Sequence, residues 1–235
     1  MLKRDPCVER RCDTMTREIL TKIYELLYDA FGPQNWWPGE TPFEIIAGAI
    51  LTQNTNWTNV EKAIANLKSA ERLNPQGLRH IDLARLAELI RPAGYYNLKS
   101  RRLKNFVDWL FDDYEGEVEN LRNVDTHRLR AELLSVKGVG RETADSILLY
   151  ALDTPVFVVD AYTARITIRH GLIEPDAGYE QLQELFESNL PRDIQLFNEY
   201  HALLVRAGKE FCKTKARCPG CPLEELPHTL EIESF

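Results

Sequence analysis

Two glycines set close together are the first residues whose type and spacing suggest chemistry. Gly138 and Gly140 are separated by one valine and stand between two apolar helical patterns. Glycine lets a backbone approach a ligand closely, and the amides that open the second helix can then hold a phosphate. The alternative is an ordinary turn between two helices that ends on a glycine cap.

Asp160 and the cysteines are the other candidates. Asp160 directly follows an apolar run and precedes an amphipathic helical pattern, a position where aspartate is a preferred N-cap residue. The chain has five cysteines, an odd number, divided between its two ends. In an intracellular protein this distribution favours a metal site over disulfide bonds. The cysteines are Cys7 and Cys12, then Cys212, Cys218 and Cys221.

The composition is that of a globular protein. The chain has 235 residues, of which 44% are hydrophobic, and a formal net charge of -7. No apolar run approaches the roughly 18 residues of a membrane span, and the first residues lack the apolar block of a signal peptide. We therefore expect a soluble, cytoplasmic protein.

Two basic clusters stand out against the negative net charge. That net charge argues against indiscriminate coating of nucleic acid, but it says little about a local patch. Each cluster is interpreted either as a solvated surface or as a contact for nucleic acid. The clusters are Lys99, Arg101, Arg102 and Lys104, and then Arg206, Lys209, Lys213, Lys215 and Arg217.

Helices must position most of these residues. Apolar residues recur at helical intervals through most of the chain. Residues 154–160 have β-branched character, but they lie between two helical patterns, so we expect a buried connection there and not a strand. The fold is therefore expected to be all-α. The helical patterns cover residues 19–31, 43–51, 60–67, 83–90, 98–111, 128–136, 143–152, 161–170, 179–190 and 197–211.

Five blocks of sequence resemble, in family order, the helix-hairpin-helix DNA glycosylases of the endonuclease III superfamily. The blocks are residues 49–57, 91–103, the glycine hairpin, 158–165 and 201–212. The resemblance implies a six-helix barrel domain at 36–152 and a smaller helical domain made from 1–35 and 153–235, with DNA in the cleft between them. It also implies a nucleoid-associated monomer whose partner is double-stranded DNA with damaged bases.

The resemblance gives Asp160 the catalytic role. As the base leaves, the deoxyribose becomes oxocarbenium-like, and a carboxylate can stabilise that charge and orient or deprotonate the attacking water. Family members that also cut the strand carry a lysine two residues after the second hairpin glycine, where this chain has Glu142. A carboxylate forms no imine, so a monofunctional, water-using enzyme is implied. Glu142 also suits the first turn of a helix for electrostatic reasons alone.

A resemblance to one branch of that family implies a base pocket. Trp36 and Trp37 followed by Pro38 and Phe43 are similar to the 3-methyladenine DNA glycosylase III branch, as is Glu142. Aromatic walls suit an extruded alkylated purine, because its positive charge stacks favourably on tryptophan. By position against that branch Lys209 also approaches the pocket, or else it contacts phosphate. The alternative for the tryptophans is that they fill a core.

The resemblance also implies a DNA-contacting surface. Gln53 would fill the gap left by the flipped base, and Tyr95 occupies the wedge position, with a buried tyrosine as the alternative. The other residues expected at the DNA are Lys137, Gly138, Val139, Gly140, Arg141, Thr143, Arg101 and Arg102.

The C-terminal cysteines resemble the family's [4Fe–4S] loop with altered spacing. Cys212, Cys218 and Cys221 read C-x5-C-x2-C, whereas the family has C-x6-C-x2-C-x5-C. His228 stands next to the place where the fourth cysteine falls. Three interpretations stay open: an iron–sulfur cluster completed by histidine or an N-terminal cysteine, a zinc ion, or no metal.

Two rival functions also fit the sequence. An endonuclease III-like enzyme for oxidised pyrimidines or other bases would need an amine other than residue 142 for lyase chemistry. A non-catalytic DNA-binding protein would use the hairpin for phosphate alone.

Overall fold

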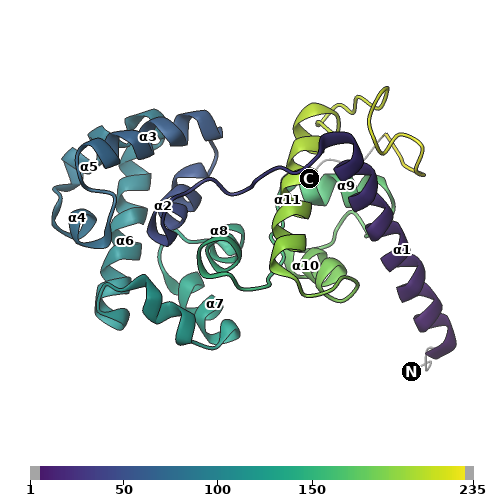
Figure 1. Cartoon of the computed structure of the whole chain (residues 1–235), viewed down its shortest axis with the longest axis horizontal. Helices are drawn as coiled ribbons and strands as arrows, with labels where there is room; N and C mark the ends of the chain where they lie inside the picture. The colour runs from purple at the N-terminus through teal and green to yellow at the C-terminus, as the bar shows by residue number, and fades with distance from the viewer. Residues whose placement is uncertain (1–5, 231–235) are drawn as a thin grey trace. The chain divides into compact units, whose positions relative to one another are not determined.

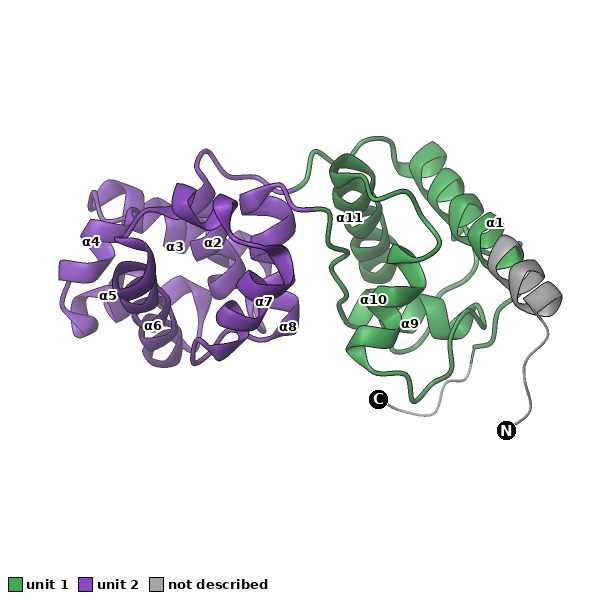
Figure 2. Ribbon diagram, turned by 90° about the horizontal axis from the view of Figure 1, so that it is seen from below, with its two compact units in different colours: residues 1–36, 155–235 green, residues 37–154 purple. Residues whose placement is uncertain are grey.

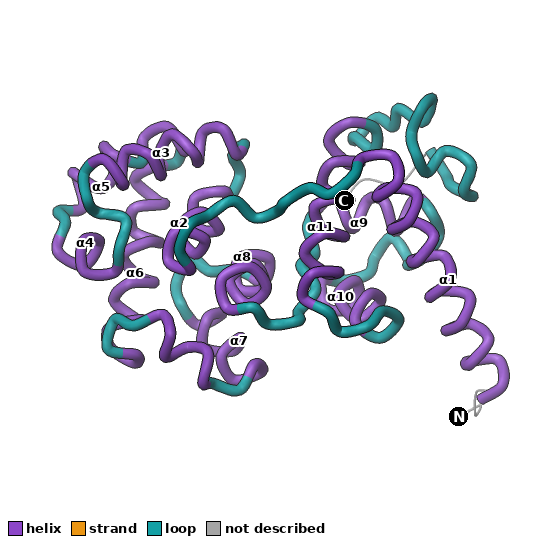
Figure 3. The backbone as a smooth tube through the Cα atoms, viewed as in Figure 1, coloured by secondary structure: helices purple, strands orange, loops and turns teal. Residues whose placement is uncertain are grey.

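The computed structural model describes residues 6–230, with side chains from Met15 onward. The all-α prediction is confirmed, since every regular element in this range is helical (Figure 3). The elements, labelled in Figure 1, are α1 (Pro6–Phe31), α2 (Pro42–Thr52), α3 (Trp57–Ser69), α4 (Pro75–His80), α5 (Leu83–Leu89), η1 (Arg91–Ala93), α6 (Tyr96–Tyr114), η2 (Val118–Asn123), α7 (Thr126–Ser135), α8 (Arg141–Ser146), η3 (Ile147–Ala151), α9 (Ala161–Arg169), α10 (Tyr179–Glu187) and α11 (Ile194–Glu210).

The chain divides into two compact units, coloured separately in Figure 2. Unit 2 is the continuous stretch Trp37–Thr154, and unit 1 combines Met1–Trp36 with Pro155–Phe235. The domain boundaries expected from the resemblance, 36 and 152, lie one and two residues from these. None of the described helices is long and apolar enough to cross a membrane.

Helix α2 is the centre of unit 2. It packs against α3, α6, α8 and η3. Eight of its residues are buried, as expected for a helix that is apolar on all sides. Thr41 starts the helix by accepting a hydrogen bond from Glu44 N, and Pro42 stands in the first turn, where a missing N–H has no cost.

Unit 1 is built on α11, which packs against both α9 and α1. Its core holds an aromatic group in which Phe157 stacks on Phe186 and meets Phe197 and Tyr200 edge to face. The hydroxyl of Tyr200 is buried and donates to Leu20 O at 2.8 Å, which joins α11 to α1. Burial raises the pKa of Tyr200 far above its usual value, so this donor stays protonated.

Two local features differ from the sequence-based expectation. Helix α4 was not predicted, because Pro75 and Gly77 look like helix breakers. In the structure Asn74 caps the helix by accepting from Gly77 N at 2.7 Å, and Pro75 occupies the first turn. The helix expected at 143–152 changes from α to π geometry at Ile147. Single π turns inside helices are frequent at functional sites.

Candidate functional site

The glycine hairpin joins α7 to α8 in unit 2. Gly138 has φ +104, a conformation that favours glycine, and a Cβ placed there would lie 2.3 Å from Cγ of Arg102. Both the backbone conformation and the close approach of Arg102 therefore require glycine. Val139 is buried and donates its N–H to Val136 O at 3.0 Å.

Gly140 has a different character from Gly138. Its φ is -98, and a Cβ placed there would have no atom within 4 Å. It is the N-cap of α8, with no side chain to cap the helix. Nothing within the protein demands glycine at this position, which leaves the space in front of the α8 N-terminus open.

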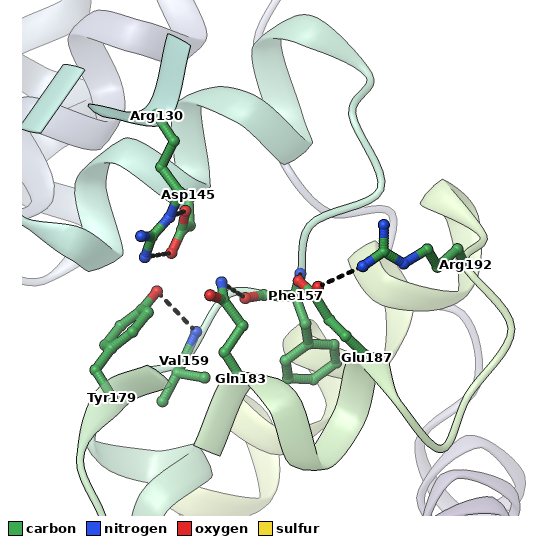
Figure 4. Close-up of polar contacts among 8 residues, drawn as sticks. All are labelled: Arg130, Asp145, Phe157, Val159, Tyr179, Gln183, Glu187 and Arg192. Atoms are coloured by element: carbon green, nitrogen blue, oxygen red, sulfur yellow. Dashed lines mark hydrogen bonds and ion pairs between the residues drawn. The ribbon is translucent and has the colours of Figure 1, made fainter. Parts of the chain in front are cut away.

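A bidentate ion pair fixes the two hairpin helices (Figure 4). Arg130 on α7 donates to both carboxylate oxygens of Asp145 on α8, at 2.6 and 2.9 Å. Asp145 is fully buried, and breaking such a pair would leave an uncompensated charge in the interior. The angle between α7 and α8, and with it the hairpin, is therefore rigidly held.

Gln53 is tied to the hairpin. Its Nε2 donates to Gly138 O at 3.1 Å and to the hydroxyl of Thr143 at 2.8 Å. Its Oε1 accepts from Nη1 of Arg102. Any movement of this side chain into a duplex must exchange these bonds.

Tyr95 is exposed, so the alternative of a buried tyrosine is wrong. The side chain is 68% exposed and directly follows Gly94. Its φ is +43, a left-handed conformation that is uncommon for a residue with a side chain. Such strain is found most often where a side chain has to be presented in one direction, at a binding site.

Side chains of α10 hold the extended segment that leads to Asp160 (Figure 4). Glu187 accepts from Phe157 N at 2.8 Å, Gln183 donates to Phe157 O at 2.8 Å, and the Tyr179 hydroxyl accepts from Val159 N at 3.3 Å. These bonds satisfy backbone N–H and C=O groups that a neighbouring strand would satisfy in a sheet. The prediction of a buried connection is confirmed.

Asp160 is the N-cap of α9, as its position predicts. Its Oδ1 accepts from the backbone N–H groups of Tyr162 and Thr163, at 2.9 and 2.8 Å, and from the Thr163 hydroxyl at 3.0 Å. Its Oδ2 lies 3.7 Å from Nε2 of His201 on α11. One carboxylate oxygen thus serves the fold, and the other faces an imidazole.

The charge of Asp160 follows from these contacts. Burial raises the pKa of this carboxyl, but the contact with His201 and the donors of Thr163 outweigh burial, so its pKa lies below the usual value. The side chain is 11% exposed. Asp160 is therefore an anion at neutral pH in a largely desolvated position, where its electrostatic effect is strong.

The two adjacent tryptophans belong to different units. In unit 2, Trp37 stacks on Tyr150 at 5.1 Å between ring centroids and meets Trp57 edge to face at 5.0 Å. In unit 1, the ammonium of Lys209 lies 5.9 Å from the ring centroid of Trp36. Both tryptophans are partly exposed, so neither is a fully buried core residue.

Comparisons with known proteins identify the family. Residues 47–192 match the family described as the HhH-GPD superfamily base excision DNA repair protein. The chain belongs to the HhH-GPD superfamily. It is accordingly a DNA glycosylase of base excision repair, built on the endonuclease III plan.

Individual relatives of this HhH-GPD protein cover most of its length. A candidate DNA repair glycosylase of Methanocaldococcus jannaschii is 53% identical over 211 residues, 89% of this chain and 96% of that protein. The crystal structure of an H. pylori 3-methyladenine DNA glycosylase bound to 1,N6-ethenoadenine is similar with a TM-score of 0.71 and 33% identity, covering 83% of this chain and 97% of that one. A non-covalent endonuclease III–DNA complex is similar with a TM-score of 0.76 and 25% identity, covering 97% and 96%.

The remaining predicted residues of this HhH-GPD protein fall into two groups. Phe43 is only 5% exposed on α2, and Thr143 is buried behind the hairpin. The others lie at the surface of their units. These exposed residues are Pro38, Arg101, Lys137, Arg141 and Glu142.

The C-terminal loop brings the predicted sulfur ligands to one cavity in unit 1. Cys212, Cys218, Cys221 and His228 all line it, together with His170, which the sequence analysis did not select. Among the described side chains, however, no three His, Cys, Asp or Glu residues are placed to hold a metal ion. The remaining candidates Cys7 and Cys12 lie outside the described side chains. The donor types suit a metal, but the described side chains do not form a metal-binding group.

Sequence reasoning missed several residues that support the site. His201 lies within a recognised block, but its contact with Asp160 spans 41 positions and no local pattern reveals it. Tyr150 supports Trp37 from the π-helical turn η3. Lys99 looks like part of a surface basic cluster, yet it is 1% exposed.

Proposed function

We propose that this HhH-GPD glycosylase is monofunctional and hydrolyses the N-glycosidic bond of a flipped, alkylated purine such as 3-methyladenine. The observation that carries the proposal is the ionised Asp160 carboxylate, which has one oxygen bound by the α9 N-terminus and the other turned to His201. The cap fixes where the charge lies, and burial keeps water from screening it.

In the proposed reaction, the base departs with the electron pair of its bond to C1′. The sugar becomes oxocarbenium-like, and the fixed anion of Asp160 stabilises the developing positive charge. Water then adds to C1′, and its proton passes to the carboxylate or to solvent. A purine alkylated at N3, such as 3-methyladenine in DNA, is already cationic, so it needs little acid catalysis to leave.

Glu142 supports the monofunctional part of the proposal. It stands in the first turn of α8, where a strand-cutting relative would need an amine nucleophile. Lys99 on α6 is buried and bonded to two carbonyls, so it is not available as that amine.

The aromatic residues support the choice of base. Trp37 is held by Tyr150 and Trp57, so its ring presents a stable face on which a flipped base could stack. Stacking of a cationic base on tryptophan contributes about 0.5–2 kcal/mol. The H. pylori relative with 1,N6-ethenoadenine bound makes a modified purine the first substrate to test.

A panel of lesion-bearing duplexes tests the substrate and the reaction type together. Purified protein is incubated with duplexes containing 3-methyladenine, 1,N6-ethenoadenine or an oxidised pyrimidine, with and without borohydride. We expect base release from the alkylated purines, strand breaks only after alkali, and no trapped adduct. Release confined to the oxidised pyrimidine, or a covalent adduct, would replace this proposal with an endonuclease III-like enzyme. Binding without release of any base would leave the non-catalytic function.

For the C-terminal loop we propose a structural metal, either zinc or an iron–sulfur cluster, which Cys212, Cys218, Cys221 and His228 would hold only after moving together, because in this structure the described side chains form no metal-binding group. Arg169 supports this, because its Nη1 donates to Cys212 Sγ at 3.1 Å and would stabilise a thiolate there. The chemistry at Asp160 needs no step through the metal. Elemental analysis and visible absorption identify the metal, and Cys218→Ser should lower its content. Purified protein that contains no metal, and whose melting temperature does not depend on added metal, would contradict this proposal.

A further inference from the structure

Lys99 on α6 is unusual because it is a lysine almost completely removed from solvent. It is 1% exposed, its ammonium donates hydrogen bonds to two backbone carbonyls, and no carboxylate forms an ion pair with it among the described residues. A buried ammonium without an anionic partner is unfavourable, and an apolar side chain of similar size would fill the space at less cost. Packing alone therefore does not explain a lysine at this position.

The partners of Lys99 provide an explanation. Its Nζ donates to Leu51 O at 2.9 Å and to Ala93 O at 2.8 Å. Leu51 is in the last turn of α2, and Ala93 is the last residue of η1. Carbonyls at helix ends lack intrahelical donors and carry partial negative charge, so an ammonium satisfies both at once.

Each of these carbonyls lies two residues before a side chain expected to enter DNA. Leu51 precedes Gln53, and Ala93 precedes Tyr95. Both backbones then turn sharply, with positive φ at Asn54, after Gln53, and at Tyr95 itself. Lys99 is thus the shared anchor of two strained turns far apart in the sequence, both within unit 2, which is purple in Figure 2.

Arg102 adds a second link from the same helix. One turn after Lys99, it donates to the side chain of Gln53, and its stem packs against Gly138 of the hairpin. Helix α6 therefore holds the Gln53 turn in two ways. Lys99 binds the backbone that leads into the turn, and Arg102 binds the side chain of Gln53. The Arg102 bond must be released for Gln53 to move, whereas the Lys99 bond need not be.

We infer that Lys99 is a positioning residue that fixes the spacing between the Gln53 turn and the Tyr95 turn, so that both side chains enter a duplex together at a flipped nucleotide. This inference rests on the proposed function, in which a base leaves the helix. It concerns recognition of the distorted site and not bond cleavage. The hairpin helices are held separately by the Arg130–Asp145 ion pair, so we expect the hairpin contact with the DNA backbone to remain when Lys99 is changed.

The test compares Lys99→Met with Lys104→Met. Lys104 is a matched control, because it lies on the same helix and its Nζ also donates to a backbone carbonyl, Arg79 O at 2.8 Å, away from both turns. For each protein, the Kd is measured for an undamaged duplex and for the same duplex with one tetrahydrofuran abasic analogue. Extrusion is followed by fluorescence of 2-aminopurine placed beside the analogue.

We expect the preference of Lys99→Met for the abasic duplex to fall about tenfold, because hydrogen bonds from a charged donor are lost. Its affinity for the undamaged duplex should be kept. The 2-aminopurine signal should fall with the preference. Lys104→Met should change neither. An unchanged preference in Lys99→Met, or an equal loss of affinity for both duplexes, would overturn the inference, as would a wild-type protein without abasic preference.

A second variant guards against misfolding. Lys99→Gln keeps two N–H donors on a shorter chain, and amide exchange of residues 52–56 and 94–96 reports on the turns directly. If amide exchange in Lys99→Gln is faster than in wild type only at these residues, the positioning role is supported. If it is faster throughout unit 2, the positioning role is refuted. Both assays are independent of base release, so a protein that prefers abasic DNA but releases no base would disprove the proposed function and leave the role of Lys99 intact.

Discussion

At the scale of single residues, Asp160 combines two tasks that usually fall to different side chains. Oδ1 closes the N-terminus of α9, and Oδ2 faces His201. Asparagine is also a good N-cap, so it can replace the structural task without the charge. The fold therefore tolerates a change that removes the proposed chemistry.

His201 should govern the pH dependence of the reaction. The contact with His201 helps to lower the pKa of Asp160, so His201→Gln should raise that pKa. Because the reaction needs the ionised carboxylate, the acid limb of the single-turnover rate profile should move to higher pH in His201→Gln. The rate on the alkaline side should change less. An acid limb at the wild-type position would show that His201 does not act through this carboxylate.

The lowered pKa of Lys99 links the stability of the protein to pH. Burial and the nearby Arg102 guanidinium lower the pKa of Lys99 from 10.5 to about 8. Between these two values the unfolded chain binds a proton that the native protein lacks, so the contribution of Lys99 to the free energy of unfolding increases with pH. A neutral amine still has two N–H donors for its two carbonyls.

We therefore predict that Lys99→Met loses more stability, relative to wild type, at pH 9.5 than at pH 7. Urea unfolding at the two pH values measures this, with Lys104→Met as the control for alkaline effects elsewhere. A stability difference independent of pH would mean that Lys99 keeps its ordinary pKa in the native protein.

At the scale of elements, the hairpin offers one glycine that the fold needs and one that it does not. Gly138 has both a positive φ and the stem of Arg102 against it, whereas Gly140 faces open space. Serine is a preferred N-cap, so Gly140→Ser should leave the free energy of unfolding unchanged or raise it by about 0.3 kcal/mol. Gly138→Ala should lower it by about 1–2 kcal/mol.

The effect of Gly140→Ser on DNA binding should differ from its effect on folding. If the α8 N-terminus touches the phosphate backbone, the added side chain blocks that approach and affinity falls equally for duplexes of unrelated sequence. Fluorescence anisotropy with two undamaged duplexes measures this. Wild-type affinity in Gly140→Ser would remove the hairpin from the DNA contact.

The sequence was informative about elements wherever a local pattern carries the physics. The helical patterns, the cap at Asp160 and the lack of a strand at 154–160 all follow from neighbouring residues. Helix α4 was missed because Pro75 and Gly77 are typical helix breakers. The structure shows that Asn74 is the N-cap of this helix and that Pro75 stands in its first turn. The π turn at Ile147 was also missed, since its sequence is equally good for an α-helix.

At the scale of the whole molecule, what escaped prediction is contact between distant parts of the chain. Asp160 was found by resemblance, but its partner His201 was not. Lys99 was grouped with surface charges, because only the fold shows that α2 and η1 end on either side of it. Trp36 and Trp37 were both placed in the base pocket, and only the structure assigns Trp36 to unit 1 and Trp37 to unit 2. Each case depends on tertiary structure, which no local sequence pattern reveals.

The most direct test of the central claim is single-turnover release of 3-methyladenine from a methylated duplex by wild type and by Asp160→Asn. Because asparagine keeps the α9 cap and removes the charge, we predict a rate lower by about a hundredfold or more, with melting and affinity for abasic DNA retained. Release of the base at the wild-type rate by Asp160→Asn would contradict the role of this carboxylate.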